Sequence, residues 1–159
     1  MKLWSAIFAA LLLAPSGAHA AGDRSSDVQV REALTIFLTA FDNLDWPAFR
    51  ACFGPDPTMF HPAAPNTRRV ETEEQFDKAW AGVFDRIRKS SGRSRPPFMQ
   101  LEPKDLRIEF PSEDVAIVTF HILNPGEIDR RTILFKRYGS AWKTVHIHAS
   151  NLRTDAEHP

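Results

Sequence analysis

The stretch "WKTVHIHASNL", residues 142–152, alternates between polar and apolar side chains near the C-terminus of the chain. This alternation predicts a β-strand, because successive side chains of a strand point to opposite faces of its sheet. The strand separates a polar row from a mainly apolar row, namely His146, His148 and Ser150 against Val145, Ile147 and Ala149. The polar row is either a chemical site, such as a metal-binding pair, or the outward face of a sheet.

Three runs before this stretch also have the composition of strands: residues 98–110, 114–123 and 129–138. Short turn-like segments separate them and no helical pattern lies between them, so the four C-terminal strands are expected to pair antiparallel. A further short strand is expected in "PTMFHPAAPN", residues 57–66. Pro62 would end it, because proline has no backbone N–H for a continuing ladder.

Three helices are predicted elsewhere, because apolar side chains recur there at three- and four-residue steps. Capping residues mark their expected starts: Ser26 with Gln29, then Asp45, then Thr72 with Gln75. The second helix is short and is expected to close at Gly54. The resulting order of helix, helix, strand, helix and four strands is that of a single α+β domain.

The N-terminal residues have the pattern of a secretory signal peptide. Lys2 precedes an apolar run, and Ala18 and Ala20 form an A-x-A motif that predicts cleavage between Ala20 and Ala21. The apolar run is too short for a membrane span, which needs about 20 residues. We therefore expect a signal peptide over residues 1–20, a linker over 21–25, one domain over 26–152 and a flexible tail over 153–159. The mature protein is expected in the periplasm or outside the cell, not in a membrane.

The charge balance argues against a nucleic-acid-binding protein, and the cysteine content excludes a domain held together by intrachain disulfides. The chain has 20 basic and 20 acidic residues, and loss of Lys2 with the signal peptide leaves one excess negative charge. This balance does not favour nucleic acid as a partner. Cys52 is the only cysteine, so the fold has no intrachain disulfide.

The order of elements and the pattern W-x-x-V-H-x-H-x-S at residues 142–150 resemble the nuclear transport factor 2-like superfamily. The resemblance is to its SnoaL-like branch and to the association domain of calcium/calmodulin-dependent protein kinase II, and "LDWPAF", "FHPAAPN" and "RRTILFKR" match further elements. It implies a cystatin-like α+β roll, in which a cone-shaped, curved antiparallel sheet wraps around three helices and encloses a conical cavity. It also implies a homodimer formed through the outer sheet face.

The resemblance assigns directions to the two rows of the last strand. His146, His148 and Ser150 are expected to face outward, toward a dimer partner, while the intervening residues line the cavity. The alternative, a metal site at the H-x-H pair, lacks a third ligand nearby in sequence. Neither a metal nor a cofactor is therefore expected.

Three residues are candidates for chemistry in the cavity. His61 stands where related ketosteroid isomerases carry their aspartate general base, and a histidine can exchange protons near neutral pH. His121 takes the place of a cavity arginine of the kinase association domain, and Arg131 that of a protonated aspartic acid of the isomerases. Phe37 replaces the isomerase tyrosine and cannot stabilise an oxyanion. The simpler interpretation of His61 is a polar group satisfied by a loop carbonyl.

The remaining cavity is expected to be mainly apolar. Its predicted walls are Phe37, Trp46, Phe60, Phe76, Trp80, Phe84, Ile133, Val145 and Ile147. The leading hypothesis is an exported domain that binds a small, largely apolar molecule, with no reaction assigned. Two alternatives stay open: an isomerase or dehydratase with His61 as general base, and a non-catalytic dimerisation or assembly module.

Overall fold

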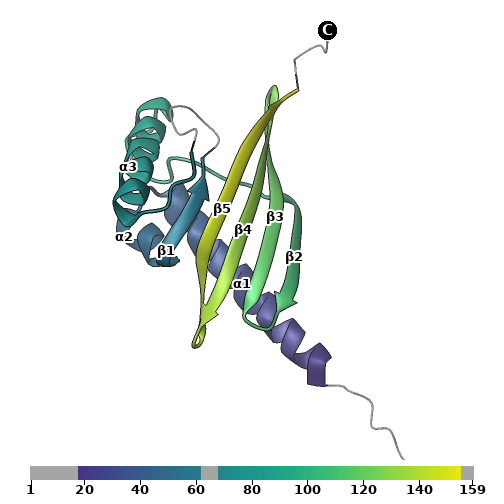
Figure 1. Cartoon of the computed structure of the whole chain (residues 1–159). Coiled ribbons are helices and arrows are strands. Elements are labelled where there is room, and N and C mark those ends of the chain that lie inside the picture. The colour runs from purple at the N-terminus through teal and green to yellow at the C-terminus, as the bar shows by residue number, and fades with distance from the viewer. Residues whose placement is uncertain (1–17, 62–67, 155–159) are drawn as a thin grey trace, which may run out of the picture.

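The computed structural model describes residues 18–61 and 68–154, with side chains from residue 25 onward. Figure 1 shows the order of elements that the sequence predicts. The elements are α1 (Ala18–Asp42), α2 (Trp46–Ala51), β1 (Phe53–Phe60), α3 (Glu73–Ser90), β2 (Lys104–Ser112), β3 (Val115–Asn124), β4 (Glu127–Tyr138) and β5 (Ala141–Arg153). Among the described residues, no helix is both long enough and apolar enough to cross a membrane.

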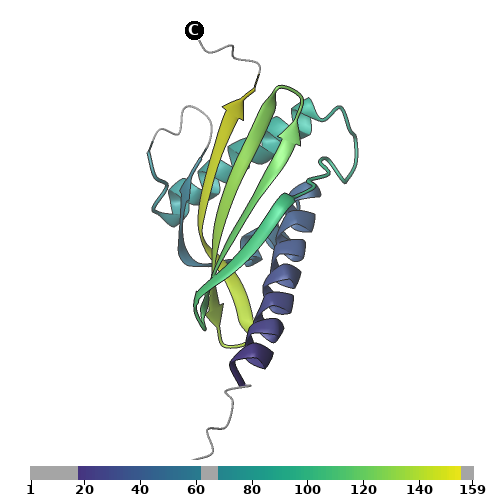
Figure 2. The ribbon, with the colours of Figure 1, turned by 90° about the vertical axis from the view of Figure 1, so that its right-hand side faces the viewer.

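The strands form one five-stranded sheet in the order β1-β5-β4-β3-β2, and the helices lie on one side of it (Figures 1 and 2). The α+β class is confirmed. Strands β2 to β5 pair antiparallel, as expected for strands joined by short turns. The edge strand β1 instead runs parallel to β5, which makes the sheet mixed. No hairpin joins these two strands, so local chain direction does not force them antiparallel.

Helix α1 begins earlier than the sequence predicts. Ser26 lies inside the helix, so the predicted capping box with Gln29 does not form a helix start. Serine costs only about 0.5 kcal/mol on the exposed side of a helix, which is too little to end it. The buried face holds Val30, Leu34, Phe37, Ala40 and Leu44. The signal-peptide prediction rests mainly on residues 1–17, which lie outside the described residues.

The predicted caps of the other two helices are confirmed. The backbone N–H of Ala48 donates to the Asp45 carboxylate at 3.1 Å, and that of Gln75 donates to the Thr72 hydroxyl at 3.2 Å. Helix α2 ends before the predicted Gly54, which belongs to β1. The chain leaves the helix there because Thr144 of β5 binds the Cys52 carbonyl at 2.9 Å and draws the segment into the sheet.

A cluster of aromatic rings fills the space between α1, α2, α3 and β1. Phe49 is fully buried, and its ring centroid lies 4.7 Å from that of Trp80. Phe53 packs edge-on against Phe76 at the same distance. Such edge-to-face pairs add to the burial of apolar area. This cluster holds α3 against the edge of the sheet.

A bulge in β5 decides which of its residues face the helices. Leu134 pairs with His146 and Phe135 pairs with Thr144, so Val145 is an extra residue without a partner on β4. Thr144 and Ile147 are both buried although they are three positions apart. In a regular strand residues three apart point to opposite faces, and the extra residue Val145 brings these two to the same face.

Candidate ligand-binding site

A cavity of about 380 Å³ lies between the inner face of the sheet and helices α1 and α3. Six residues proposed from the sequence line it: Phe37, His61, Trp80, Arg131, Ile133 and Ile147. Thirteen further residues complete the lining: Leu38, Phe41, Met59, Val83, Arg86, Ile87, Met99, Leu101, Phe120, Ile122, Asp129, Ala149 and Asn151. Most of these side chains are apolar.

The sheet register divides the cavity into an apolar part and a polar end. Ile147 of β5 lies opposite Ile133 of β4, and both are buried. Two residues further along β5, Ala149 lies opposite Arg131. The next inward pair is Asn151 with Asp129. The polar side chains therefore gather where β5 ends and β4 begins, whereas the apolar walls continue toward the aromatic cluster.

Ala149 separates the two candidate residues that the structure brings to this cavity. Phe60 pairs with His148, so the next residue along the chain, His61, falls beside Ala149 on the side away from Arg131. Neighbouring strands are about 4.8 Å apart, which places the backbones of His61 and Arg131 about 10 Å from each other. The methyl group of Ala149 leaves space between the two longer side chains.

Arg131 is held by several oxygen atoms of its own chain. Its Nη2 lies 3.2 Å from Asp129 Oδ2, and its Nη1 donates to the carbonyl of Arg130 at 3.0 Å. The same Nη1 is 3.4 Å from the Ser150 carbonyl and 3.4 Å from the Asn151 side-chain oxygen. Burial lowers the pKa of Arg131, and the charges of Asp129 and Glu127 oppose that effect.

Asp129 is the less exposed member of this ion pair, with 14% of its side chain accessible against 22% for Arg131. Burial raises its pKa, while the positive charge of Arg131 and a 3.2 Å hydrogen bond from Asn124 Nδ2 act in the opposite direction. Its Oδ1 atom is buried and has no hydrogen-bond partner in the part of the chain that the structure describes. An unpaired buried acceptor costs about 1–3 kcal/mol.

His121 does not belong to the cavity, which corrects the expectation from family resemblance. Its neighbours Phe120 and Ile122 are buried on the inner face, so His121 points to the outer face of β3. Its side chain is 41% exposed, with Nδ1 at 3.5 Å from Asp105 Oδ2. Alternation along β3 is unbroken between these residues, so no bulge reverses its direction.

Five of the predicted wall residues also lie elsewhere: Trp46, Phe60, Phe76, Phe84 and Val145. Phe76 is part of the aromatic cluster and is fully buried. Trp46 and Phe84 contact each other and border a shallow hollow on another side of α3. Val145 occupies the bulge, and Phe60 lies on the outer face. Apolar spacing identifies buried residues, but it does not distinguish the wall of a cavity from the solid core.

Sequence reasoning missed the contribution of the segment before β2. Met99 and Leu101 reach the cavity because Asp42, at the end of α1, binds this segment. The Asp42 carbonyl accepts from Phe98 N at 2.7 Å, and its carboxylate accepts from Leu101 N at 3.2 Å. Burial raises the pKa of Asp42, and the bond from Leu101 partly offsets this. Spacing along the chain carries no signal for such a contact.

Two histidines of β5 and one phenylalanine of β1 meet on the outer face of the sheet. His146 and His148 flank the ring of Phe60, with centroid distances of 5.9 and 5.6 Å. Phe60 is 41% exposed. Burial lowers the pKa of His146, as do the nearby charges of His148 and Arg69. Within the described ranges, no group of three or more His, Cys, Asp or Glu side chains has a geometry that could hold a metal ion.

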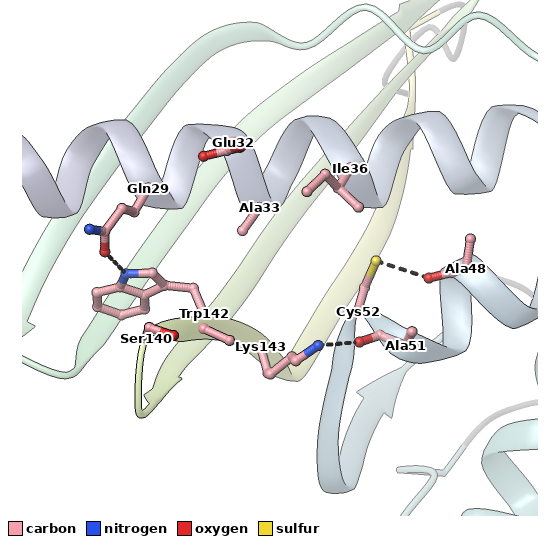
Figure 3. A pocket seen from close by; sticks show the side chains of 11 residues that line it. Gln29, Glu32, Ala33, Ile36, Ala48, Ala51, Cys52, Ser140, Trp142 and Lys143 are labelled. Carbon is pink, nitrogen blue, oxygen red and sulfur yellow. Dashed lines mark hydrogen bonds between the residues drawn. The ribbon is translucent and has the colours of Figure 1, made fainter.

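A second hollow, of about 320 Å³, lies between α1, α2 and the turn that joins β4 to β5 (Figure 3). Trp142 Nε1 donates to Gln29 Oε1 at 3.2 Å across one end of it, and Lys143 Nζ donates to the Ala51 carbonyl at 2.6 Å (Figure 3). The thiol of Cys52 donates to the Ala48 carbonyl at 3.3 Å. Burial raises the pKa of this thiol, although Lys143 opposes the shift. The thiolate is thus disfavoured here.

Comparison with solved structures identifies the same fold in proteins of low sequence identity. An NTF2-like protein of unknown function from Pseudomonas putida KT2440 has 19% identity and a TM-score of 0.63, covering 80% of this chain and 87% of that one. A candidate dehydratase of the NTF2-like family from Streptomyces avermitilis has 18% identity and a TM-score of 0.63, covering 81% and 97%. The association domain of CaMKII from C. elegans has 19% identity and a TM-score of 0.59, covering 82% and 98%. At these identities the likeness shows a shared fold and not shared chemistry.

A comparison with curated proteins finds no match. A family model does match: the model of the SnoaL-like domain covers residues 30–154, which is most of the chain. This protein therefore belongs to the SnoaL-like domain family and has the NTF2-like, cystatin-like fold.

Proposed function

We propose that this protein binds a small, largely apolar molecule in the cavity between its sheet and helices. The observation that carries the proposal is the cavity itself, whose volume of about 380 Å³ falls in the usual range for ligand sites. Its apolar walls and the few polar groups at one end are also typical of such sites. The volume equals that of about a dozen water molecules, whose release would favour binding of an apolar ligand.

Binding of a fluorescent probe to the wild type and to a variant whose cavity is filled by a larger side chain tests this proposal. N-phenyl-1-naphthylamine is neutral and apolar, and its emission rises when it leaves water. Replacement of Ala149 by Leu places a larger side chain between His61 and Arg131, so binding of the probe should weaken by about tenfold or more. Ala81→Leu makes the same change on an exposed part of α3 outside this cavity and should leave binding unchanged. Equal binding by all three proteins would refute the proposal.

The natural ligand can be sought directly. Native mass spectrometry of protein purified from its own host, followed by denaturation, would identify any small molecule that is released. An apolar compound that rebinds to the wild type, and that Ala149→Leu or Trp80→Ala binds more weakly, supports the proposed site. A compound that rebinds equally well to these variants would place the binding site elsewhere.

An enzymatic function of the isomerase or dehydratase type is a second candidate. It is supported by the presence of His61 and Arg131 in one cavity, on either side of Ala149. In this mechanism His61 acts as the general base and Arg131 stabilises the developing negative charge. If the released compound is converted by the wild type, His61→Gln should abolish turnover and retain binding. Unchanged turnover by that variant would exclude His61 as the base.

We also propose that the outer sheet face forms a homodimer. Phe60 of the edge strand β1 is 41% exposed beside His146 and His148 of β5, and exposed aromatic rings are enriched among interface anchors. Light scattering should show that Phe60→Ser dissociates the dimer. Val28→Ser, which removes a more exposed apolar side chain from α1, should not. A wild type that is monomeric at high micromolar concentration would contradict this proposal.

Export of the protein stays a proposal that rests on the N-terminal sequence. The pattern of Lys2, the apolar run and the A-x-A motif supports cleavage after Ala20. Intact-mass measurement on protein from the periplasm and the medium of its host tests it. A mature chain starting at Ala21 is expected, and an uncleaved cytoplasmic chain would contradict the proposal.

A further inference from the structure

The charge of Arg131 is matched inside the cavity by a residue of the same strand. Asp129 and Arg131 are two positions apart on β4, so both side chains point to the inner face. Their charged atoms lie 3.2 Å apart, and neither side chain is more than a quarter exposed. The pair therefore brings no net charge to the polar end of the cavity.

The guanidinium group of Arg131 is also largely occupied by protein oxygens. Nη2 faces Asp129, while Nη1 lies within 3.4 Å of two backbone carbonyls and the side-chain oxygen of Asn151. An arginine clamps a carboxylate when two parallel N–H groups are available for its two oxygens. Here a ligand carboxylate would compete with Asp129 for those donors and would stand next to a second negative charge.

A neutral polar group meets no such competition. A hydroxyl can donate to the Asp129 carboxylate and accept from a nearby N–H donor at the same time. Asp129 lines the cavity, and its Oδ1 atom is a buried acceptor without a partner among the described residues, so a hydroxyl that donates to it would satisfy that acceptor. The other cavity arginine, Arg86, is exposed on α3, where water weakens its attraction for an anion.

We propose that Asp129 sets the ligand specificity of this cavity, because by neutralising Arg131 it selects neutral molecules with a hydroxyl or carbonyl group over carboxylates of the same size. The inference rests on the proposed function, since it concerns the ligand of the same cavity. It assigns Asp129 a specificity role and makes no statement about catalysis.

Displacement of N-phenyl-1-naphthylamine by 1-octanol, 2-octanone and octanoate tests the inference in the full chain. Near pH 8 octanoate is fully ionised, and the three compounds have similar size. Wild-type protein should bind octanol and octanone about tenfold or more tightly than octanoate. Asp129→Asn keeps the shape of the side chain and frees Arg131, so octanoate affinity should rise by about tenfold while octanol affinity changes by less than about threefold.

Two control variants separate local from general charge effects. Asp105→Asn removes an equal charge from an exposed residue beside His121 and should leave all three affinities unchanged. Combining Asp129→Asn with Arg131→Met should abolish the gain for octanoate. If Asp129→Asn fails to fold, as judged by circular dichroism, Asp129→Ser takes its place, and the wild-type preference is measured in either case.

The outcomes are distinct. Preference of the wild type for octanoate, or octanoate affinity that does not rise in a folded Asp129 variant, would overturn the specificity role and leave the proposed function intact. Failure of the wild type to bind the probe and all three ligands would instead refute the proposed function itself.

Discussion

His146 on β5 is joined to Thr58 on β1 by a hydrogen bond of 2.7 Å between the histidine Nδ1 and the threonine Oγ1. The two residues are opposite each other in the parallel strand pair that adds β1 to the edge of the sheet. This side-chain bond on the outer face therefore helps to hold the strand from which His61 continues into the cavity. It also gives His146 a structural role that does not depend on a dimer partner.

Replacement of Thr58 by Val should lower the free energy of unfolding by about 1–2 kcal/mol, because it leaves a partly buried ring nitrogen without its partner. Urea denaturation near pH 8 measures this difference. Thr119→Val is the matched control on the outer face of β3. The hydroxyl of Thr119 makes no side-chain hydrogen bond to any residue that the structure describes. Equal losses in both variants would show that the bond contributes nothing.

The free energy of unfolding should decrease as the pH is lowered, because His146 takes up a proton more readily in the unfolded chain than in the folded protein. The folded-state pKa of His146 is lowered, first by burial and then by the charges of His148 and Arg69. The unfolded chain therefore binds a proton more readily, and stability is lost as pH falls from above 6.5 toward the folded pKa. His146→Gln should show a shallower loss than the wild type in denaturation curves across this range. Identical pH dependence in the two proteins would rule out this contribution.

The pH dependence at Asp129 should have the opposite direction. Its folded pKa is raised above 3.8, so the folded state binds a proton more readily than the unfolded state. The contribution of Asp129 is largest below 3.8 and declines as pH rises through the folded pKa. The wild type should therefore gain stability relative to Asp129→Asn as pH falls from neutrality toward 4. A difference that shrinks would show that attraction by Arg131 outweighs burial, and a constant difference would show that the two effects cancel.

Cys52 should react slowly with iodoacetamide in the folded protein. Burial raises the pKa of its thiol, which also donates to the Ala48 carbonyl, so the reactive thiolate is scarce. Near pH 8 we expect alkylation to be about tenfold or more slower than for a free cysteine. Mass spectrometry follows the reaction, and denaturing urea should restore the rate of an exposed thiol. Fast alkylation of the native protein would reveal that the second hollow opens readily.

Local patterns account for the elements and for part of the site. The caps at Asp45 and Thr72 were predictable because each cap uses a backbone N–H only three residues away. Alternation put Ile147 and Ala149 on the face opposite to His148, and the family resemblance supplied the direction; in the structure Ile147 and Ala149 line the cavity. Alternation failed at Val145 because a bulge inserts one residue opposite β4, and a bulge depends on the partner strand.

The cavity itself depends on contacts between distant segments. Asp129 was missed because its importance comes from Arg131, Asn124 and the neighbouring Asn151, which define its surroundings only after β4 and β5 pair. Resemblance placed His121 in the cavity, whereas its position between Phe120 and Ile122 on β3 turns it outward. Family likeness transfers the frame of the fold more reliably than the direction of one side chain.

The sequence by itself determined the α+β class, the order of helices and strands and the caps of α2 and α3, because these follow from periodicity and contacts within short segments. Tertiary structure alone decided that β1 pairs in parallel with β5, that Val145 forms a bulge, and that Asp129 pairs with Arg131 at the polar end of the cavity. These features arise from the register between strands and from packing across many residues. No spacing within a single segment encodes them.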